Sequence, residues 1–286
     1  QAPEAREGLR QRTAEAPRAP RTPVATPSKP LVRPSSSPFR VTEELGRGLL
    51  GTTFKGIDTR NGRPVTVKFL RKDLLGDRAV VQQFLTEARL AQSLEHPSLV
   101  RLLGLTEIKG EKAAIMEYVD GFDLGKFLSR NKRLSVKQAV DVLTTLCMAL
   151  GHAHERKLLH RDLKLTNVLI ARGGKLRLAG FGLGALRTPG LGKADGYPSP
   201  EFLSGGSLDE RSDIFSMGGL VLHTLSGVDP GSQELAFNGA LPSLRQLVPN
   251  IPEGLAQILS CCLAEEPGAR FHTMSEVLAA AGPLRG

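Results

Sequence analysis

The feature that most constrains the fold of this chain is a change in hydrophobic pattern near residue 120. Before it, short runs of β-branched and apolar residues alternate with turn residues, which is typical of strands. After it, apolar residues recur every three or four positions over longer segments, which is typical of amphipathic helices. We therefore predict an α+β architecture with a small antiparallel-sheet lobe followed by a larger, mainly helical lobe. Ligands in such architectures usually bind between the lobes.

Several segments before residue 120 carry the strand pattern. They are residues 39–48, 52–58, 65–70, 100–108 and 112–119. One helix interrupts them, because Asp77 is a good N-cap and apolar residues then recur at helical spacing as far as Leu94. Helices are expected in the second lobe as well. They fall within residues 123–130, 135–156, 209–227, 253–264 and 273–281.

A large share of the +9 net charge lies near the N-terminus. Residues 1–38 contain seven Lys and Arg against three Glu, together with eight prolines. Such a composition does not build a core, so we predict a disordered, basic, Pro-rich tail or linker. A basic arm that docks on a partner is the functional alternative, and a nucleic-acid binder led by this tail is a more remote one.

The cysteine content and the hydropathy favour the cytoplasm. Three cysteines, two of them adjacent at Cys261 and Cys262, are too few and too poorly placed for a disulfide framework, which favours a reducing compartment. No apolar run reaches the length of a membrane span, and no signal-peptide pattern is visible. Cytoplasmic localisation is therefore our expectation.

Three sequence motifs carry the chemistry. Gly46-x-Gly48-x-x-Gly51 lies between two predicted strands and is read either as a flap over a nucleotide or as a plain hairpin turn. Lys68 stands on the next strand and Glu87 on the following helix. The third motif is 160-HRDLKLTN-167, after the long helix of the second lobe.

In this order and spacing, these motifs resemble the protein kinase family over about residues 39 to 282. Ser199-Pro200-Glu201, Asp213 and Arg270 match further family positions that brace the helical lobe. The lysine within 160-HRDLKLTN-167 is the Ser/Thr kinase form, and the compact helical end is similar to the bacterial branch. The resemblance implies a kinase-like domain over residues 39–286. Its N-lobe would be residues 39–119 and its C-lobe residues 120–286.

The resemblance also implies a role for each matched residue. Lys68 would contact the α and β phosphates of ATP and be oriented by Glu87. Asp162 would accept the hydrogen bond of the incoming hydroxyl, Lys164 would steady the phosphoryl group, and Asn167 would bind a magnesium ion. The remaining positions would enclose the nucleotide. These are Gly46, Gly48, Gly51, Thr53, Thr66, Met116, Glu117, Val119 and Leu169.

Four departures from the family pattern concern nucleotide, metal or substrate handling. Gly180 replaces the metal-binding aspartate of Asp-Phe-Gly, and losing one such electrostatic group commonly costs an enzyme about 3 to 4 kcal/mol. Ala194 replaces the threonine that aligns the substrate. Thr53 and Thr66 place hydroxyls on the adenine roof. Ala91 is small where a larger side chain usually stacks, which leaves a gap or lets the helix shift.

These departures favour a pseudokinase, which is a kinase fold kept as a protein-binding or allosteric regulatory module in signalling. We expect a protein partner, such as an active kinase or another signalling protein, and no nucleic-acid partner. ATP binding would be weak and insensitive to magnesium, with no tight magnesium site. The alternative is an atypical but active Ser/Thr protein kinase in which Asn167 is the only protein ligand of the metal, since Lys68, Glu87, Asp162 and Lys164 are all present.

Overall fold

The computed structural model of the chain describes residues 37–187, 196–229 and 244–285. The chain divides into two units, Gln1–Pro30 and Leu31–Gly286, and every described residue lies in the second. The expected tail of residues 1–38 falls almost entirely outside the described residues, so its disorder stays a prediction. Ala194 falls outside them as well.

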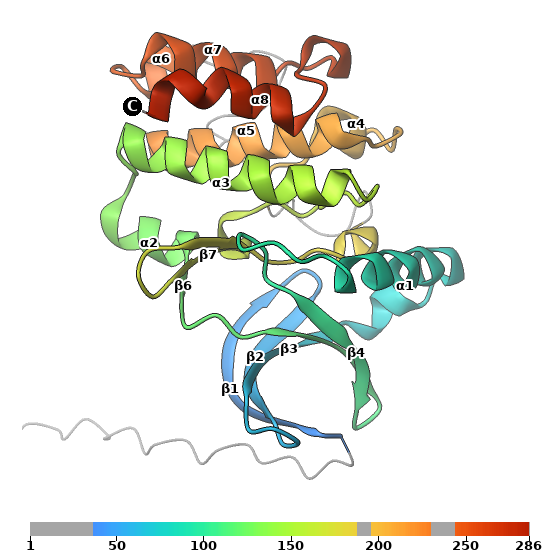
Figure 1. Cartoon of the computed structure of the whole chain (residues 1–286). Coiled ribbons are helices and arrows are strands. Elements are labelled where there is room, and N and C mark those ends of the chain that lie inside the picture. The colour runs from blue at the N-terminus through green and yellow to red at the C-terminus, as the bar shows by residue number, and fades with distance from the viewer. Residues whose placement is uncertain (1–36, 188–195, 230–243, 286) are drawn as a thin grey trace, which may run out of the picture. The chain divides into compact units, whose positions relative to one another are not determined.

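The first lobe is built on an antiparallel sheet with the strand order β1-β2-β3-β5-β4 (Figure 1). Its strands are β1 Phe39–Gly48, β2 Gly51–Asp58, β3 Pro64–Leu70, β4 Leu102–Ile108 and β5 Glu111–Glu117. The strand predictions are confirmed. β4 begins later than residue 100, because the Val100 N–H donates to the Leu178 carbonyl at 2.9 Å and so joins the other lobe.

Helix α1 (Arg78–Gln92), which follows the short η1 turn (Lys72–Leu75), is the main helix of this lobe. The Asp77 carboxylate accepts the N–H groups of Ala79 and Val80, so the predicted N-cap is confirmed. The helix packs against β4. Its inward side includes Phe84, Glu87, Ala88 and Ala91, all buried.

A second sheet opens the helical lobe and carries two of the predicted motifs. It has the order β6-β7-β8, with antiparallel pairing throughout. Its strands are β6 Gly121–Asp123, β7 Val168–Ala171 and β8 Leu176–Leu178. The 160-HRDLKLTN-167 loop, which ends in the turn η2 (Leu165–Asn167), leads into β7, and Gly180 follows β8 after one residue. The sheet thereby brings two loops together.

The rest of the second lobe is helical, as predicted. Its helices are α2 Leu124–Asn131, α3 Val136–His154, α4 Pro200–Leu203, α5 Glu210–Ser226, α6 Leu244–Leu247, α7 Glu253–Cys262 and α8 Met274–Ala281, with short turns η3 Gly184–Leu186, η5 Pro267–Ala269 and η6 Gly282–Arg285. Helices α3 and α5 lie side by side (Figure 1). α5 is buried almost all round, which makes it the central element of the lobe.

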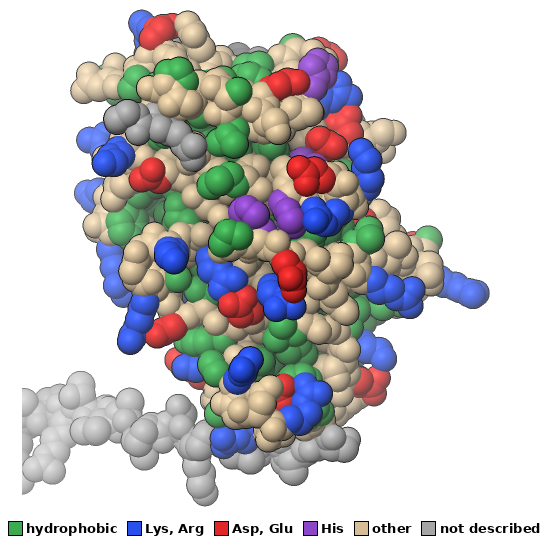
Figure 2. All heavy atoms as spheres, in the orientation of Figure 1, with side chains coloured by type: hydrophobic (Ala, Val, Ile, Leu, Met, Phe, Trp, Pro, Cys, Tyr) green, Lys and Arg blue, Asp and Glu red, His purple; other side chains and the backbone are tan. Residues whose placement is uncertain are grey.

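Two sequence predictions concern the surface charge and the absence of a membrane-spanning segment. On the face that Figure 2 shows, Lys and Arg side chains are interspersed with Asp and Glu side chains. Excess positive charge is therefore not gathered into one broad patch on that face. None of the helices in the described part of the chain combines the length and apolarity that crossing a bilayer requires.

Candidate functional site

A cavity of about 580 Å³ lies between the two lobes and collects most of the predicted site residues. The predicted residues that line it are Gly46, Gly48, Gly51, Thr53, Thr66, Lys68, Met116, Glu117, Val119, Lys164, Asn167, Leu169 and Gly180. Two predicted residues, Glu87 and Asp162, do not line it. Their positions are the main corrections to the expected site.

The three glycines of the first motif have different physical roles. A Cβ atom on Gly51, whose φ is +145°, would lie 1.8 Å from the Phe69 carbonyl oxygen of β3, so this glycine is required by strand packing. A Cβ atom on Gly46 would have no neighbour within 4 Å, and one on Gly48 would meet only the Lys164 Nζ at 3.9 Å. The first two glycines therefore leave backbone open to the cavity, while the third serves the sheet.

The threonine roof is half-buried and borders the cavity. Thr53 on β2 and Thr66 on β3 both line it, and neither hydroxyl has a hydrogen-bond partner among the described residues. A purine stacked beneath them would remove these hydroxyls from water without replacing their hydrogen bonds. That desolvation costs free energy, as the sequence predicted.

The Glu87 carboxylate pairs with a residue other than the one expected. Its Oε1 accepts hydrogen bonds from the Arg161 guanidinium and from the Gln83 amide, the latter at 3.0 Å. Among the described residues no ion pair joins Glu87 to Lys68. The predicted orientation of Lys68 by Glu87 is therefore wrong for this conformation, because the arginine of the catalytic-loop motif takes the carboxylate instead.

Asp162 is buried and is covered by Arg187. Its carboxylate forms ion pairs with the Arg187 Nη1 at 3.1 Å and with the Lys164 Nζ at 3.4 Å. The Asn167 amide donates to the Asp162 backbone carbonyl at 2.7 Å and to its carboxylate at 3.3 Å. Only 4 % of Asp162 is exposed. The expected contact with an incoming hydroxyl is therefore blocked in this conformation.

Gly180 has a backbone conformation that disfavours the family's aspartate. Its φ is +106°, and a Cβ atom would lie 3.2 Å from the Asn167 amide nitrogen. Phe181 is buried and makes an edge-to-face contact with His160 at 4.6 Å between ring centroids. Burial lowers the pKa of His160, whose Nε2 lies 2.9 Å from the Ala179 carbonyl.

Ala91 does not leave a gap. A Cβ atom on Gly182 would lie 2.7 Å from the Ala91 Cβ and 3.0 Å from the Ala88 Cα. The backbone of the Gly-Phe-Gly segment thus occupies the space that a larger side chain at position 91 would fill. The gap expected from the sequence is wrong, because a segment distant in sequence packs into it.

The donors near the cavity do not fit a magnesium ion. Mg²⁺ in proteins is usually held by one or two carboxylates with water and phosphate oxygens. Here the nearest predicted carboxylate, that of Asp162, is held by two cations, and position 180 has no side chain. In the described part of the chain, no three His, Cys, Asp or Glu side chains gather into a metal-binding group. Asn167 alone is a poor site for this ion.

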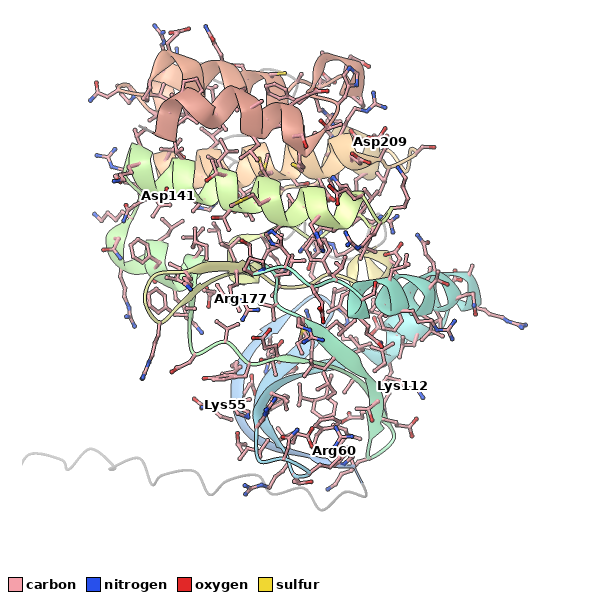
Figure 3. All side chains as sticks on the ribbon, in the orientation of Figure 1. Lys55, Arg60, Lys112, Asp141, Arg177 and Asp209 are labelled. Carbon is pink, nitrogen blue, oxygen red and sulfur yellow. The ribbon has the colours of Figure 1, made fainter. Side chains whose placement is uncertain are left out.

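A residue that the sequence did not single out stabilises the segment joining the lobes. Arg177 of β8, labelled in Figure 3, makes two hydrogen bonds to the Glu117 carboxylate at 2.6 and 2.7 Å. Its Nε donates to the Leu99 carbonyl at 3.1 Å. The hydrogen bond from Arg177 lowers the pKa of Glu117. The Glu117 N–H donates to the Arg101 carbonyl at 3.0 Å, so that donor is not available to a ligand.

The residues expected to brace the helical lobe do so. The Arg270 guanidinium contacts both Glu201 carboxylate oxygens at 2.8 and 2.9 Å. The Asp213 carboxylate accepts the N–H groups of His160 and Arg161, and it lies 2.8 Å from the His154 Nε2. These contacts anchor the catalytic-loop motif on α5. Burial would raise the pKa of Asp213, but its hydrogen bonds and the neighbouring histidines hold the pKa below the ordinary value.

Comparisons with known proteins agree with this architecture. The family model described as "Protein kinase domain" matches residues 39–281. The chain is 29% identical over 255 residues to the probable serine/threonine-protein kinase PknB of Lactococcus lactis, which covers 84% of this chain and 41% of that protein. It is also 29% identical over 256 residues to the serine/threonine-protein kinase PrkC of Bacillus subtilis, covering 85% and 40%. The chain thus spans about two fifths of the length of these relatives.

Solved structures show the same fold. A crystal structure of a double mutant of the Mycobacterium tuberculosis PknI kinase domain aligns with a TM-score of 0.77 and 25% identity, covering 89% of this chain and 98% of that one. Another crystal structure of the PknI kinase domain aligns with a TM-score of 0.74 and 26% identity, covering 86% and 96%. The described residues therefore have the bilobal kinase fold.

Proposed function

We propose, since this chain belongs to the protein kinase family, that it is a pseudokinase that acts as a protein-binding or allosteric regulatory module in signalling. The observation that carries the proposal is Gly180. It leaves the cavity without the carboxylate that would hold a metal against the phosphates, and its φ of +106° disfavours any side chain there. Weak or absent phosphoryl transfer follows.

The surroundings of Asp162 support the same proposal. A group that accepts the proton or hydrogen bond of a substrate hydroxyl must lie within hydrogen-bond reach of it. Asp162 lies under Arg187, and 2% of its side chain is exposed. The scaffold residues Glu201, Asp213 and Arg270 keep their contacts. The chain thus retains the shape of the family while its chemistry is impaired.

A transfer assay tests this proposal directly. Purified chain is incubated with radiolabelled ATP, a general protein substrate and either Mg²⁺ or Mn²⁺, beside the Asp162→Asn variant and an active Ser/Thr kinase. We expect the chain to transfer no more phosphate than Asp162→Asn does. Transfer that is clearly above background and lost in Asp162→Asn would overturn the proposal and favour the active-kinase alternative, in which Asn167 is the only protein ligand of the metal.

We also propose weak nucleotide binding that does not require magnesium. Lys68 and Lys164 line the cavity and can face phosphates without a metal. Among the described residues the lining includes two carboxylates, and both are engaged by cations, Glu117 by Arg177 and Asp123 by Lys126. The threonine roof opposes tight binding of the base.

Thermal unfolding measures this binding, because a ligand that binds only the folded state raises the melting temperature. We expect a small rise with millimolar ATP that is the same with and without Mg²⁺. Lys68→Met should abolish the rise. Lys112→Met is the matched control, since Lys112 is exposed and paired with Glu107 away from the cavity lining. A rise that appears only with Mg²⁺ would contradict the proposal.

The partner is proposed to be a protein, such as an active kinase or another signalling protein. Cross-linking followed by mass spectrometry in the native cell is the direct way to identify it. Recovery of nucleic acid instead, in a salt-sensitive complex lost on deletion of residues 1–38, would favour the nucleic-acid alternative.

A further inference from the structure

One stretch of the helical lobe carries positive charge without any acid within it. Residues 124–140, which run from α2 through the following loop into α3, contain no Asp or Glu. They contain five cations, Lys126, Arg130, Lys132, Arg133 and Lys137. Helix α2 and its loop to α3 form one edge of the lobe (Figure 1). A surface with one sign of charge attracts ligands of the opposite sign, so this edge is suited to an anionic partner.

Three of these cations lack an ionic partner within the part of the chain that the structure describes. Lys126 pairs with the Asp123 carboxylate, at 3.3 Å between Nζ and Oδ2. Arg130, Lys132 and Arg133 form no such pair with any described carboxylate, and all three residues are exposed. Their charge is therefore directed to the solvent or to a ligand.

A pocket of about 610 Å³ lies beside these cations. It is bordered by α2, by the loop after α2 and by the C-terminal end of α5. Lys132 and Arg133 line it, together with the apolar side chains of Leu128 and Leu165, and its described lining contains no carboxylate. Its lining shares only Gly125 and Ser129 with that of the cavity between the lobes, so most of its residues are its own.

The two serines of the pocket use their hydroxyl hydrogens within the fold. The Ser129 Oγ donates to the Lys126 carbonyl at 2.8 Å, and the Ser226 Oγ donates to the Leu222 carbonyl at 2.9 Å. Among the described lining residues, Lys132 and Arg133 are thus the charged donors that remain for a ligand.

The histidine of the pocket adds no charge of either sign at neutral pH. Burial lowers the pKa of His223, and this effect outweighs the opposing influence of Asp229. The His223 Nδ1 lies 2.7 Å from the Tyr197 hydroxyl and 3.9 Å from the Asp229 carboxylate, which lies outside the pocket lining. The net charge of the lining therefore comes from its two cations.

The loop that carries the two cations is held in a fixed position. Lys132 has a φ of +64°, which is uncommon for a residue with a side chain. Its N–H donates to the Leu128 carbonyl, and the Leu134 N–H donates to the Thr224 carbonyl of α5, both at 2.7 Å. A Cβ atom on Gly227 would lie 2.8 Å from the Lys132 carbonyl oxygen. Strained backbone that is maintained by packing is frequent at functional sites.

We propose that this pocket binds an acidic segment of the partner protein, through carboxylates or phosphoryl groups. The inference rests on the proposed regulatory function and adds the chemistry of the partner. Lys132 and Arg133 contact the anionic groups, since a guanidinium binds a carboxylate or a phosphate through two parallel hydrogen bonds. Leu128 and Leu165 contact the apolar parts of the segment. The described lining has no Phe, Tyr or Trp on which bases could stack, which disfavours a nucleic acid.

Fluorescence anisotropy with labelled peptides of equal length measures this binding. One peptide carries glutamates, a second carries phosphoserines at the same positions, and a third carries glutamines. We expect the full chain to bind the first two, more weakly as the ionic strength rises, and not to bind the third. Tighter binding of the second peptide would identify phosphoryl groups as the preferred anions, and equal or weaker binding would identify carboxylates.

Two double variants of equal charge test the assigned residues. Lys132→Gln with Arg133→Gln should weaken binding of the acidic peptides about tenfold or more, because two charge-assisted contacts are lost. Lys72→Gln with Arg89→Gln is the matched control, since it removes the same charge from exposed residues of the first lobe. The control should change the affinity by no more than about twofold, because distant exposed charges are screened.

Charge reversal separates recognition from damage to the fold. Lys132→Glu with Arg133→Glu should abolish binding of the acidic peptides and should create binding of a fourth peptide that carries lysines. Destabilisation of the chain would not produce this gain, because an unfolded pocket has no preference of its own.

Several results would overturn the inference. They are equal binding of the glutamine peptide, equal weakening by the two glutamine double variants, and no binding of the lysine peptide after charge reversal. Binding of phosphatidylserine vesicles or single-stranded DNA through Lys132 and Arg133, without binding of acidic peptides, would overturn it as well. Phosphoryl transfer by the parent chain would instead overturn the proposed function, whatever the peptides show. The two failures are therefore distinguishable.

Discussion

Two buried arginines, Arg270 and Arg187, differ in how fully their guanidinium groups are hydrogen-bonded. All five N–H groups of the Arg270 guanidinium donate hydrogen bonds. Two go to Glu201, and the others go to the carbonyls of Ala264, Arg211 and Glu265. The Arg187 Nη1, by contrast, approaches Asp162 without a well-aligned hydrogen bond.

The difference in hydrogen bonding matters because both arginines are buried. A buried charge is costly unless both its partner and its remaining hydrogen bonds are supplied. Arg270 has both, and its side chain is fully buried. In the described part of the chain, Arg187 has an ion-pair partner in Asp162, but its buried Nη1 makes no hydrogen bond. The hydrogen-bonding capacity of the guanidinium is therefore fully used at Arg270, and incompletely used at the Arg187 Nη1 beside Asp162.

Replacing each arginine by an apolar residue should give the largest difference in the free energy of unfolding. Arg270→Met should lower the free energy of unfolding by about 3 to 5 kcal/mol, because Glu201 and three carbonyls lose their donor. Arg187→Met should lower it by about 1 kcal/mol or less, since the segment of residues 180–187 can open locally. Urea unfolding measures both. Equal losses would show that the two arginines are equivalent supports.

Substitutions of Gly180 should have the next largest effect on the free energy of unfolding. Gly180→Asp and Gly180→Ala should both destabilise the chain by about 1 to 3 kcal/mol, because a side chain at a φ of +106° is strained. The alanine variant carries the strain without the carboxylate and is the control. We expect no phosphoryl transfer from Gly180→Asp while Arg187 covers Asp162.

Restored transfer in Gly180→Asp alone would argue that the missing carboxylate is the only defect. Phosphoryl transfer could instead be restored only when Gly180→Asp is combined with Arg187→Gln, and in neither single variant. That result would identify the cover over Asp162 as a second, independent obstacle.

Acid should weaken the Arg270 support. Burial raises the pKa of Glu201, but the hydrogen bonds from Arg270 and Ser212 outweigh this effect and lower it from 4.5 to about 2. A carboxylate with a lowered pKa in the folded state stabilises the fold above its unfolded pKa and loses that contribution as the pH falls. Stability should therefore fall between about pH 4.5 and pH 2. Glu201→Gln, followed by urea unfolding across this range, should show a shallower fall. An identical slope in the two chains would contradict the assignment.

Loss of the contact between Arg177 and Glu117 should have only a small effect, because both side chains are partly exposed, at 19% and 35%. Arg177→Gln should cost about 1 kcal/mol in the free energy of unfolding. It should also speed hydrogen exchange in residues 117–119, which join the lobes. Arg172→Gln, at a more exposed pair, should change neither quantity. A loss as large as that of Arg270→Met would show that this pair is also a principal support.

Local patterns account for what was predicted correctly. The N-cap at Asp77 and the strands and helices follow from spacing within a few residues, so the sequence reveals them. The bracing role of Arg270 and Glu201 was predicted from the family resemblance, since both residues match its pattern. Most cavity residues were predicted in the same way.

The errors concern contacts that no local pattern encodes. Glu87 has more than one basic residue within reach, and which of them it binds depends on where α1 and the 180–187 segment lie. Arg187 follows a glycine-rich stretch with no motif of its own, so nothing in the sequence marked it as the partner of Asp162. Arg177 was missed for the same reason.

The sequence by itself determined the bilobal kinase fold, the cavity lining and the missing carboxylate at Gly180, because these depend on periodicity and on residue identity at motif positions. Only the tertiary structure decided that Ala91 accommodates Gly182, that Arg161 binds Glu87 and that Arg187 covers Asp162. The physical reason is that a charged side chain pairs with the nearest suitable partner in space. That partner is set by packing between segments far apart in the chain.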